Sequence, residues 1–151
     1  MSLRSLFRSG SALKPWYQGG LAFACERCGA CCRGAPGYVW ITEEEIRAVA
    51  RRLNMSVEEF SGRFLRTVLG RTCLRERENG DCMLLDKTGR ACLAYEERPV
   101  QCRAWPWWHE TLASPEAWEA ARRECPGIGT GPIHPADVIE EQRERDRRAN
   151  G

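Results

Sequence analysis

Residues 25–32 read CERCGACC, which places four cysteines within eight positions. We call this stretch the cysteine segment. Thiols three residues apart on a turn converge on one side of the chain, and Gly29 lets the backbone curl tightly between them. Cys31 and Cys32 are adjacent, so we expect their side chains to diverge. Either one ligates a metal while the other packs, or each faces a different metal.

Five further cysteines follow, at positions 73, 82, 92, 102 and 125, which brings the total to nine. The count is odd, and the first 20 residues lack the continuous apolar stretch of a secretory signal. We therefore expect a reducing, cytoplasmic setting. A disulfide framework is the competing interpretation, but the odd count, the missing signal and the adjacent pair favour metal ligation.

Four arginines lie beside or near the cysteines, at positions 27, 33, 98 and 103. A centre with four thiolates carries about two net negative charges, and these arginines could offset that charge through hydrogen bonds to sulfur. The competing interpretation is that they are ordinary solvated surface residues.

The composition indicates a domain that depends on more than its apolar core. A length of 151 residues suits one domain. Leu, Ile, Val and Phe account for 27 of them, about 18%, which is near the level at which burial alone struggles to fold a chain. The formal net charge of +2 makes no case for nucleic-acid binding. No apolar run approaches the roughly 18 residues that would span a membrane.

Several helices are predicted from their start signals. Two begin with capping boxes, in which a Thr or Ser precedes a Glu by three residues. Another begins with Ser114 followed by proline at the first helical position. The first helix should end in a left-handed turn at Asn54. The expected helical ranges are 43–53, 57–67, 115–124 and a charged tail from about residue 135, after a loop over 128–135.

A β-meander is expected between residues 72 and 95. Asn79–Gly80 is a strong hairpin signal, and 86–89 forms a second turn. A short strand is also expected at 38–41, and a turn or short helix after Arg98 should carry Cys102. The expected strands of the meander are 72–77, 81–85 and 91–95, which would bring Cys73, Cys82 and Cys92 toward one end or face.

These elements predict an α+β fold, a small metal-stabilised domain in which a short antiparallel β-meander packs with two or three helices. Three parts are expected along the chain. They are a basic N-terminal arm over 1–24, a cysteine-cluster metal-binding domain over 25–127, and a loop with a charged C-terminal helix or tail over 128–151.

The string CERCGACC, the GDC that ends at Cys82, and the C-x-x-Y and RP-x-x-CR elements of CLAYEERPVQCRAWP together resemble the YkgJ-like CxxCxxCC cysteine-cluster family. Its members are described as zinc- or iron-chelating, or iron–sulfur, proteins. HETLASPEAW and the CPG that begins at Cys125 resemble one bacterial branch of that family. Cys73 matches no fixed cysteine and is expected to be a spare. The resemblance implies the metal ligands Cys25, Cys28, Cys31, Cys32, Cys82, Cys92, Cys102 and Cys125.

The spacing favours an iron–sulfur centre over zinc. Structural zinc usually takes two paired knuckles, and only one end of this chain has a CxxC pair. Iron–sulfur clusters accept a CxxCxxC run with remote cysteines, although the closing C-x3-C-P of bacterial ferredoxins is missing here. The family description contributes as much to this preference as the spacing does. Eight ligands could serve two four-coordinate centres, or one cluster and a separate ion.

Three functions follow from these patterns. The favoured one is an iron–sulfur protein with a redox or electron-transfer accessory role and a redox or client protein as partner. The alternative is a zinc-binding structural or protein-interaction module. The third is a metal-dependent enzyme with an open coordination site, which His109 or Arg103 could line. Trp105, Trp107 and Trp108 are expected to supply burial. The other interpretation, which is compatible with burial, is a hydrophobic lid that keeps water from the metal or stacks on a ligand.

Overall fold

The computed structural model describes residues 13–33 and 37–150 and has the expected α+β character. Its short strands form two antiparallel pairs, β1 with β4 and β2 with β3. No helix in the described part of the chain is long and apolar enough to cross a membrane. In chain order the elements are β1 (Leu21–Phe23), η1 (Ala30–Cys32), α1 (Glu43–Arg52), α2 (Val57–Phe64), β2 (Leu65–Val68), β3 (Arg71–Leu74), η2 (Tyr95–Glu97), α3 (Val100–Arg103), α4 (Pro115–Glu124), β4 (Ile128–His134) and α5 (Ala136–Asn150).

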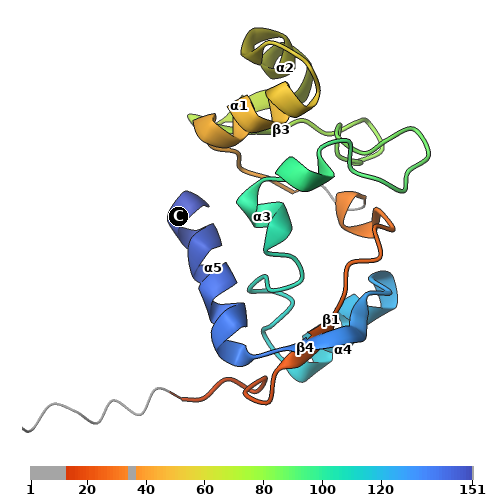
Figure 1. Ribbon diagram of the computed structural model, residues 1–151, viewed down its shortest axis with the longest axis vertical. Helices are drawn as coiled ribbons and strands as arrows, with labels where there is room; N and C mark the ends of the chain where they lie inside the picture. Colours follow the sequence, from red (N-terminus) through yellow and green to blue (C-terminus); the bar gives the residue numbers. More distant parts are fainter. Residues whose placement is uncertain (1–12, 34–36, 151) are drawn as a thin grey trace, which may run out of the picture.

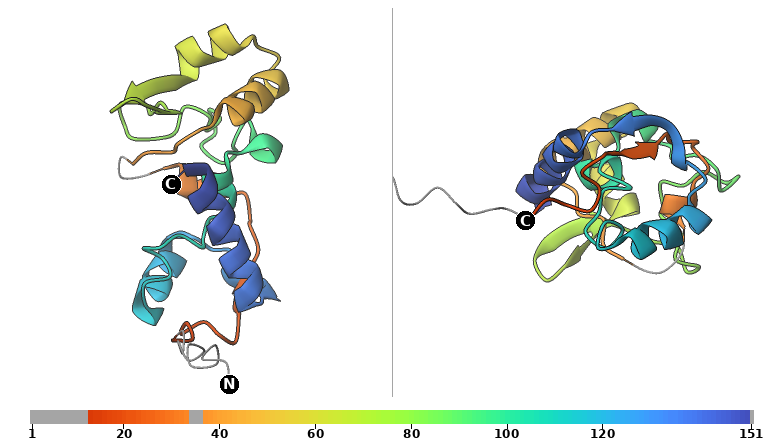
Figure 2. Two further views of the ribbon diagram at one scale, coloured as in Figure 1. Left: turned by 90° about the vertical axis from the view of Figure 1, so that its left-hand side faces the viewer. Right: turned by 90° about the horizontal axis from the view of Figure 1, so that it is seen from below.

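The elements gather at two ends of the molecule. Helices α1 and α2 and the β2–β3 hairpin form one end, and α4 with the β1–β4 pair forms the other (Figures 1 and 2). Helices α3 and α5 lie between the two ends and contact each other. Each end has its own cluster of buried apolar side chains.

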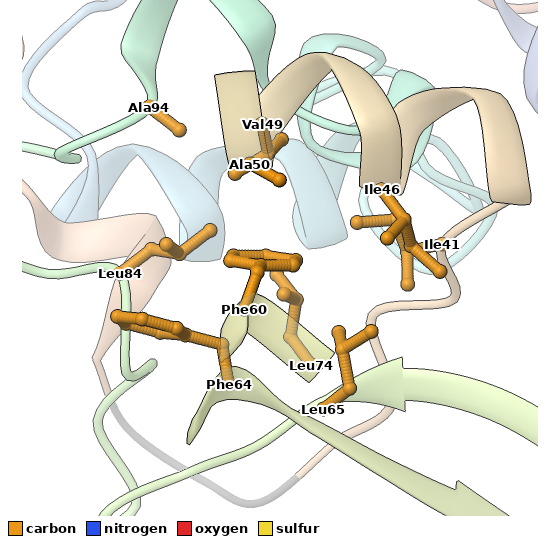
Figure 3. Close-up of a cluster of buried hydrophobic side chains, with 10 residues drawn as sticks. All are labelled: Ile41, Ile46, Val49, Ala50, Phe60, Phe64, Leu65, Leu74, Leu84 and Ala94. Atoms are coloured by element: carbon orange, nitrogen blue, oxygen red, sulfur yellow. The ribbon is translucent and has the colours of Figure 1, made fainter. Parts of the chain in front are cut away.

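The first apolar cluster lies between α1, α2 and the β2–β3 hairpin (Figure 3). Phe60 is completely buried, and its ring stacks on that of Phe64 with centroids 5.1 Å apart. Cys82 and Cys92 are partly buried against this cluster. Two candidate ligands are thus anchored by the core of this end.

The second apolar cluster joins the ends of the sequence. Leu21 of β1 pairs with His134 of β4, while Tyr17 and Ile139 are buried beside them. Trp107 stacks on Trp118 of α4 with ring centroids 5.8 Å apart. Tryptophan therefore supplies burial here, as the sequence predicts.

The predicted helices are confirmed, with one change of boundary. Thr42 and Glu45 form the expected capping box of α1, and Asn54 has φ 56°. The second helix ends at Phe64 rather than at residue 67, because the next residues pair with β3 as strand β2. Ser56 caps α2 through the Glu59 amide.

The predicted strands are largely wrong in position. The observed hairpin joins 65–68 to 71–74. Of the expected strands at 72–77, 81–85 and 91–95, only β3 and two isolated bridges are found, Glu76 with Cys82 and Leu85 with Cys92. The strand at 38–41 is a single bridge from Trp40. The expected loop at 128–135 is wrong for most of its length, because β4 finds its partner β1 more than 100 residues earlier in the chain.

Candidate metal centre

The cysteine segment packs against the turn at 86–89. Gly29 has φ 75°, and a Cβ there would lie 2.7 Å from the carbonyl oxygen of Gly89. The Arg33 guanidinium donates hydrogen bonds to the carbonyls of Cys28, at 3.0 Å, and of Gly89. Only glycine permits this close approach, so position 29 sets the distance between the segment and the turn.

Backbone hydrogen bonds position two later cysteines. The amide of Cys82 donates to the carbonyl of Cys32 at 2.8 Å, which ties the strand bridge to the cysteine segment. The Asp86 carboxylate accepts hydrogen bonds from the Thr88 hydroxyl at 2.7 Å and from backbone amides that follow it. These bonds lower the pKa of Asp86 and hold the turn that leads to Cys92.

Five thiols form one group in the structure. The side chain of Cys32 lies close enough to those of Cys31 and Cys92 to change their pKa values. Cys82 and Cys102 lie near enough for their charges to act on the same thiols. The expectation that the adjacent side chains of Cys31 and Cys32 diverge is therefore wrong, because the tight turn of η1 lets them meet.

Hydrogen bonding and burial give these thiols different pKa values. Hydrogen bonding with Cys32 lowers the pKa of Cys31 to about 7 and that of Cys92 to about 7. The interaction with these two neighbours raises the pKa of Cys32 itself. Burial raises the pKa of Cys82 to about 11 and that of Cys102 well above its usual range. Metal ligation would have to deprotonate the buried thiols, which a bound cation favours.

Among the four arginines, Arg98 is the one whose charge acts on the thiols. Its guanidinium lowers the pKa values of Cys31, Cys92 and Cys102. Arg98 is held by a 2.9 Å hydrogen bond to the Tyr95 carbonyl and by stacking of its guanidinium on the Tyr95 ring. Arg27 lies on the Tyr95 ring too, and it pairs with Glu96 at 3.3 Å. Arg103 lines a groove beside α5. Arg98 thus provides positive charge near the thiols, while its guanidinium hydrogen-bonds to a carbonyl rather than, as predicted, to sulfur.

The remaining cysteines lie apart from this group. Cys25 is exposed and hydrogen-bonds to the Tyr95 side chain, and Cys28 is partly exposed. Cys125 is buried in the second apolar cluster. Cys73 is fully buried in β3. Ligand roles for Cys25, Cys28 and Cys125, and for the other five predicted ligands, stay predictions.

Within residues 13–33 and 37–150, no three Cys, His, Asp or Glu side chains are placed so that they could hold one ion together. Cys31 and Cys92 interact with Cys32 instead. Their chemistry nevertheless fits a thiophilic metal, because sulfur donors select zinc or iron–sulfur clusters. Ligation would exchange the hydrogen bonds between thiols for bonds to metal through rotation of the cysteine side chains.

The comparisons with known proteins agree with this donor set. The CxxCxxCC family model, described as a "putative zinc- or iron-chelating domain", matches residues 24–126. The protein belongs to the CxxCxxCC family. All nine cysteines fall within the match, whereas β1, β4 and α5 lie outside it.

A curated relative is similar to part of this chain. The protein MJ0661 of the archaeon Methanocaldococcus jannaschii is 32% identical over 91 residues, which cover 60% of this chain. The chain spans about half the length of that relative. No solved structure matches the chain significantly.

A cavity of about 920 Å³ adjoins the group of five thiols in this CxxCxxCC domain. Cys31, Cys32, Cys82, Trp105, Trp108 and His109 are among the residues that line it. His109 is exposed, while His134 hydrogen-bonds to the Phe23 carbonyl at 2.9 Å and is structural.

The tryptophans serve both the core and the cavity. Trp105, Trp107 and Trp108 all line the cavity beside the thiols, and Trp107 is also buried in the second apolar cluster. The indole nitrogen of Trp105 is buried and has no hydrogen-bond partner among the described residues. Sequence reasoning placed Trp105 in the tryptophan cluster but carried no signal for this unpaired donor.

Proposed function

We propose that this CxxCxxCC protein is a cytoplasmic iron–sulfur protein with a redox or electron-transfer accessory role, acting with a protein partner. The observation that carries the proposal is the gathering of five thiols from separate stretches of sequence, at 31, 32, 82, 92 and 102. These thiols would hold the centre, and the bound cluster would supply one-electron chemistry.

The space beside the thiols favours a cluster over a single zinc ion. The number of thiols suits either, because zinc and iron–sulfur clusters both take four cysteine ligands. A cluster also needs room for inorganic sulfide, and the cavity beside the thiols offers about 920 Å³. The charge of Arg98 would stabilise the reduced, more negative form of such a centre.

A structural zinc site is the second candidate, and the arrangement of the two apolar clusters favours it. Cys82 and Cys92 pack on the first cluster, whereas Trp105 packs on the second and lines the thiol cavity. A metal bound by the thiols would join the two apolar clusters, each of which is small. Its binding would then contribute directly to the stability of the fold.

The experiment that separates these functions is the metal and acid-labile sulfide content of the anaerobically purified protein, together with its visible spectrum. Iron with sulfide and a broad absorbance near 400 nm, as is typical of iron–sulfur centres, is the expected result. Stoichiometric zinc without sulfide would refute the redox proposal and support the structural module.

A matched pair of variants tests whether the group of five thiols binds the metal. Cys92→Ala removes a member of the group, and Cys73→Ala removes a buried cysteine outside it. We expect the first to lose metal and the second to retain it. Equal loss in both variants would show that metal content follows general stability rather than ligation.

A further inference from the structure

We infer that the indole N–H of Trp105 donates a hydrogen bond to a sulfur atom of the bound metal centre. The inference rests on the proposal that the thiol group binds a metal, but it holds for either an iron–sulfur cluster or zinc. It assigns a positioning and tuning role to a residue outside the cysteine pattern.

The backbone and the neighbouring ring hold Trp105 in place. It follows Cys102 by three residues, and its amide donates to the Cys102 carbonyl at 3.3 Å. Its ring meets that of Trp108 edge to face, with centroids 4.9 Å apart and planes at 77°. The indole is therefore carried by the same turn that carries one of the five thiols.

The indole nitrogen of Trp105 stands out against comparable groups in the molecule. The indoles of Trp16 and Trp108 each donate a 2.8 Å hydrogen bond to a backbone carbonyl, those of Leu112 and Gln101. That of Trp105 is buried with no partner among the described residues. A buried donor without an acceptor costs about 1–3 kcal/mol, so an acceptor is expected in the complete protein.

The cavity beside this indole supplies the acceptor. Trp105 lines it together with Cys31, Cys32 and Cys82. An indole N–H only donates, and a thiol is a weak acceptor. A metal-bound thiolate or a cluster sulfide is a stronger one because it carries negative charge. Hydrogen bonds to such sulfurs tune the electronic properties of the metal.

The test uses cobalt(II) alone as a probe, added to the reduced, metal-free protein. Trp105→Phe keeps an aromatic ring and deletes the donor, and Trp108→Phe deletes an indole N–H that already bonds to the backbone. In Trp105→Phe, we expect the thiolate-to-cobalt charge-transfer band to move to longer wavelength and the affinity to fall about 10–100-fold. Trp108→Phe should leave the band in place, because the indole N–H that it removes bonds to a backbone carbonyl and not to sulfur.

An unmoved band in Trp105→Phe overturns the inference, even if stability falls. If that variant does not fold, NMR of the wild-type protein with 15N-labelled tryptophan tests the inference. Zinc(II) should shift one indole proton and slow its exchange, and that proton should show contact with the Trp108 ring; no such change refutes the inference. A wild-type protein with no thiolate band would refute metal binding itself, whereas finding native zinc rejects only the redox function.

Discussion

Replacing Gly29 with alanine tests whether the contact between the cysteine segment and the 86–89 turn builds the metal centre. The added Cβ would lie 2.7 Å from the Gly89 carbonyl oxygen and 3.1 Å from Cδ1 of Leu85. The first neighbour is backbone, so the segment or the turn has to move. The thiols of the segment would then shift relative to Cys82 and Cys92.

The size of the effect follows from a comparison with Gly70. Both glycines have left-handed φ angles, 75° at Gly29 and 76° at Gly70, but a Cβ at Gly70 would have no atom within 4 Å. The left-handed conformation costs a non-glycine residue about 1–2 kcal/mol. Gly70→Ala should show that cost alone. Gly29→Ala should add about 1–3 kcal/mol for the forced displacement.

Thermal unfolding and metal competition measure the two consequences. For a chain of this size, each 1 kcal/mol lowers the melting temperature by about 2–4 °C. We expect Gly29→Ala to melt lower than Gly70→Ala, and we expect only Gly29→Ala to release metal more readily to a chelator. Equal melting temperatures and equal metal affinities for the two variants would refute the assignment of this contact to the centre.

Three further predictions concern the cysteine segment, a helix cap and an ion pair. Cys28→Ser should lower both the melting temperature and the metal content if the whole segment ligates; unchanged values of both would reject its ligand role. Thr42→Ala should lower the free energy of unfolding by about 1 kcal/mol through the lost cap, at constant metal content. Burial opposes ionisation of Glu140, but hydrogen bonds from Tyr17 and Arg143 hold its pKa below the usual value. The charged form therefore stabilises the fold above the pKa of the unfolded chain, so Glu140→Gln should cost stability at pH 7 and less as the pH falls toward 4 in urea unfolding.

The helices were predictable because their signals are local. Thr42 and Glu45 satisfy the first amides of α1 within four residues of sequence, and Ser114 does the same for α4. A cap needs no information about the rest of the molecule. The end of α2 at Phe64 was not predictable in this way, since it depends on pairing with β3.

The strands were misplaced because pairing is not local. The Asn79–Gly80 turn forms, but the residues around it make one bridge rather than two strands. Strand β4 looked like a loop, since its glycines and proline disfavour a strand. Its partner β1 lies at the other end of the chain, so only the tertiary structure reveals the pair.

For the candidate site, the sequence determined which atoms are available. Nine cysteines and the spacing CERCGACC indicate sulfur ligation and the family, because ligand chemistry and local turn geometry are written in residue type and order. The tertiary structure decided which thiols meet. It brings Cys31 and Cys32 together with three distant cysteines and buries Cys125 in an apolar cluster. It also places the Trp105 indole, which has no partner among the described residues, in the lining of the cavity beside these thiols. Those relations depend on how the two cores pack around the centre, and contacts between distant residues are set by burial rather than by spacing along the chain.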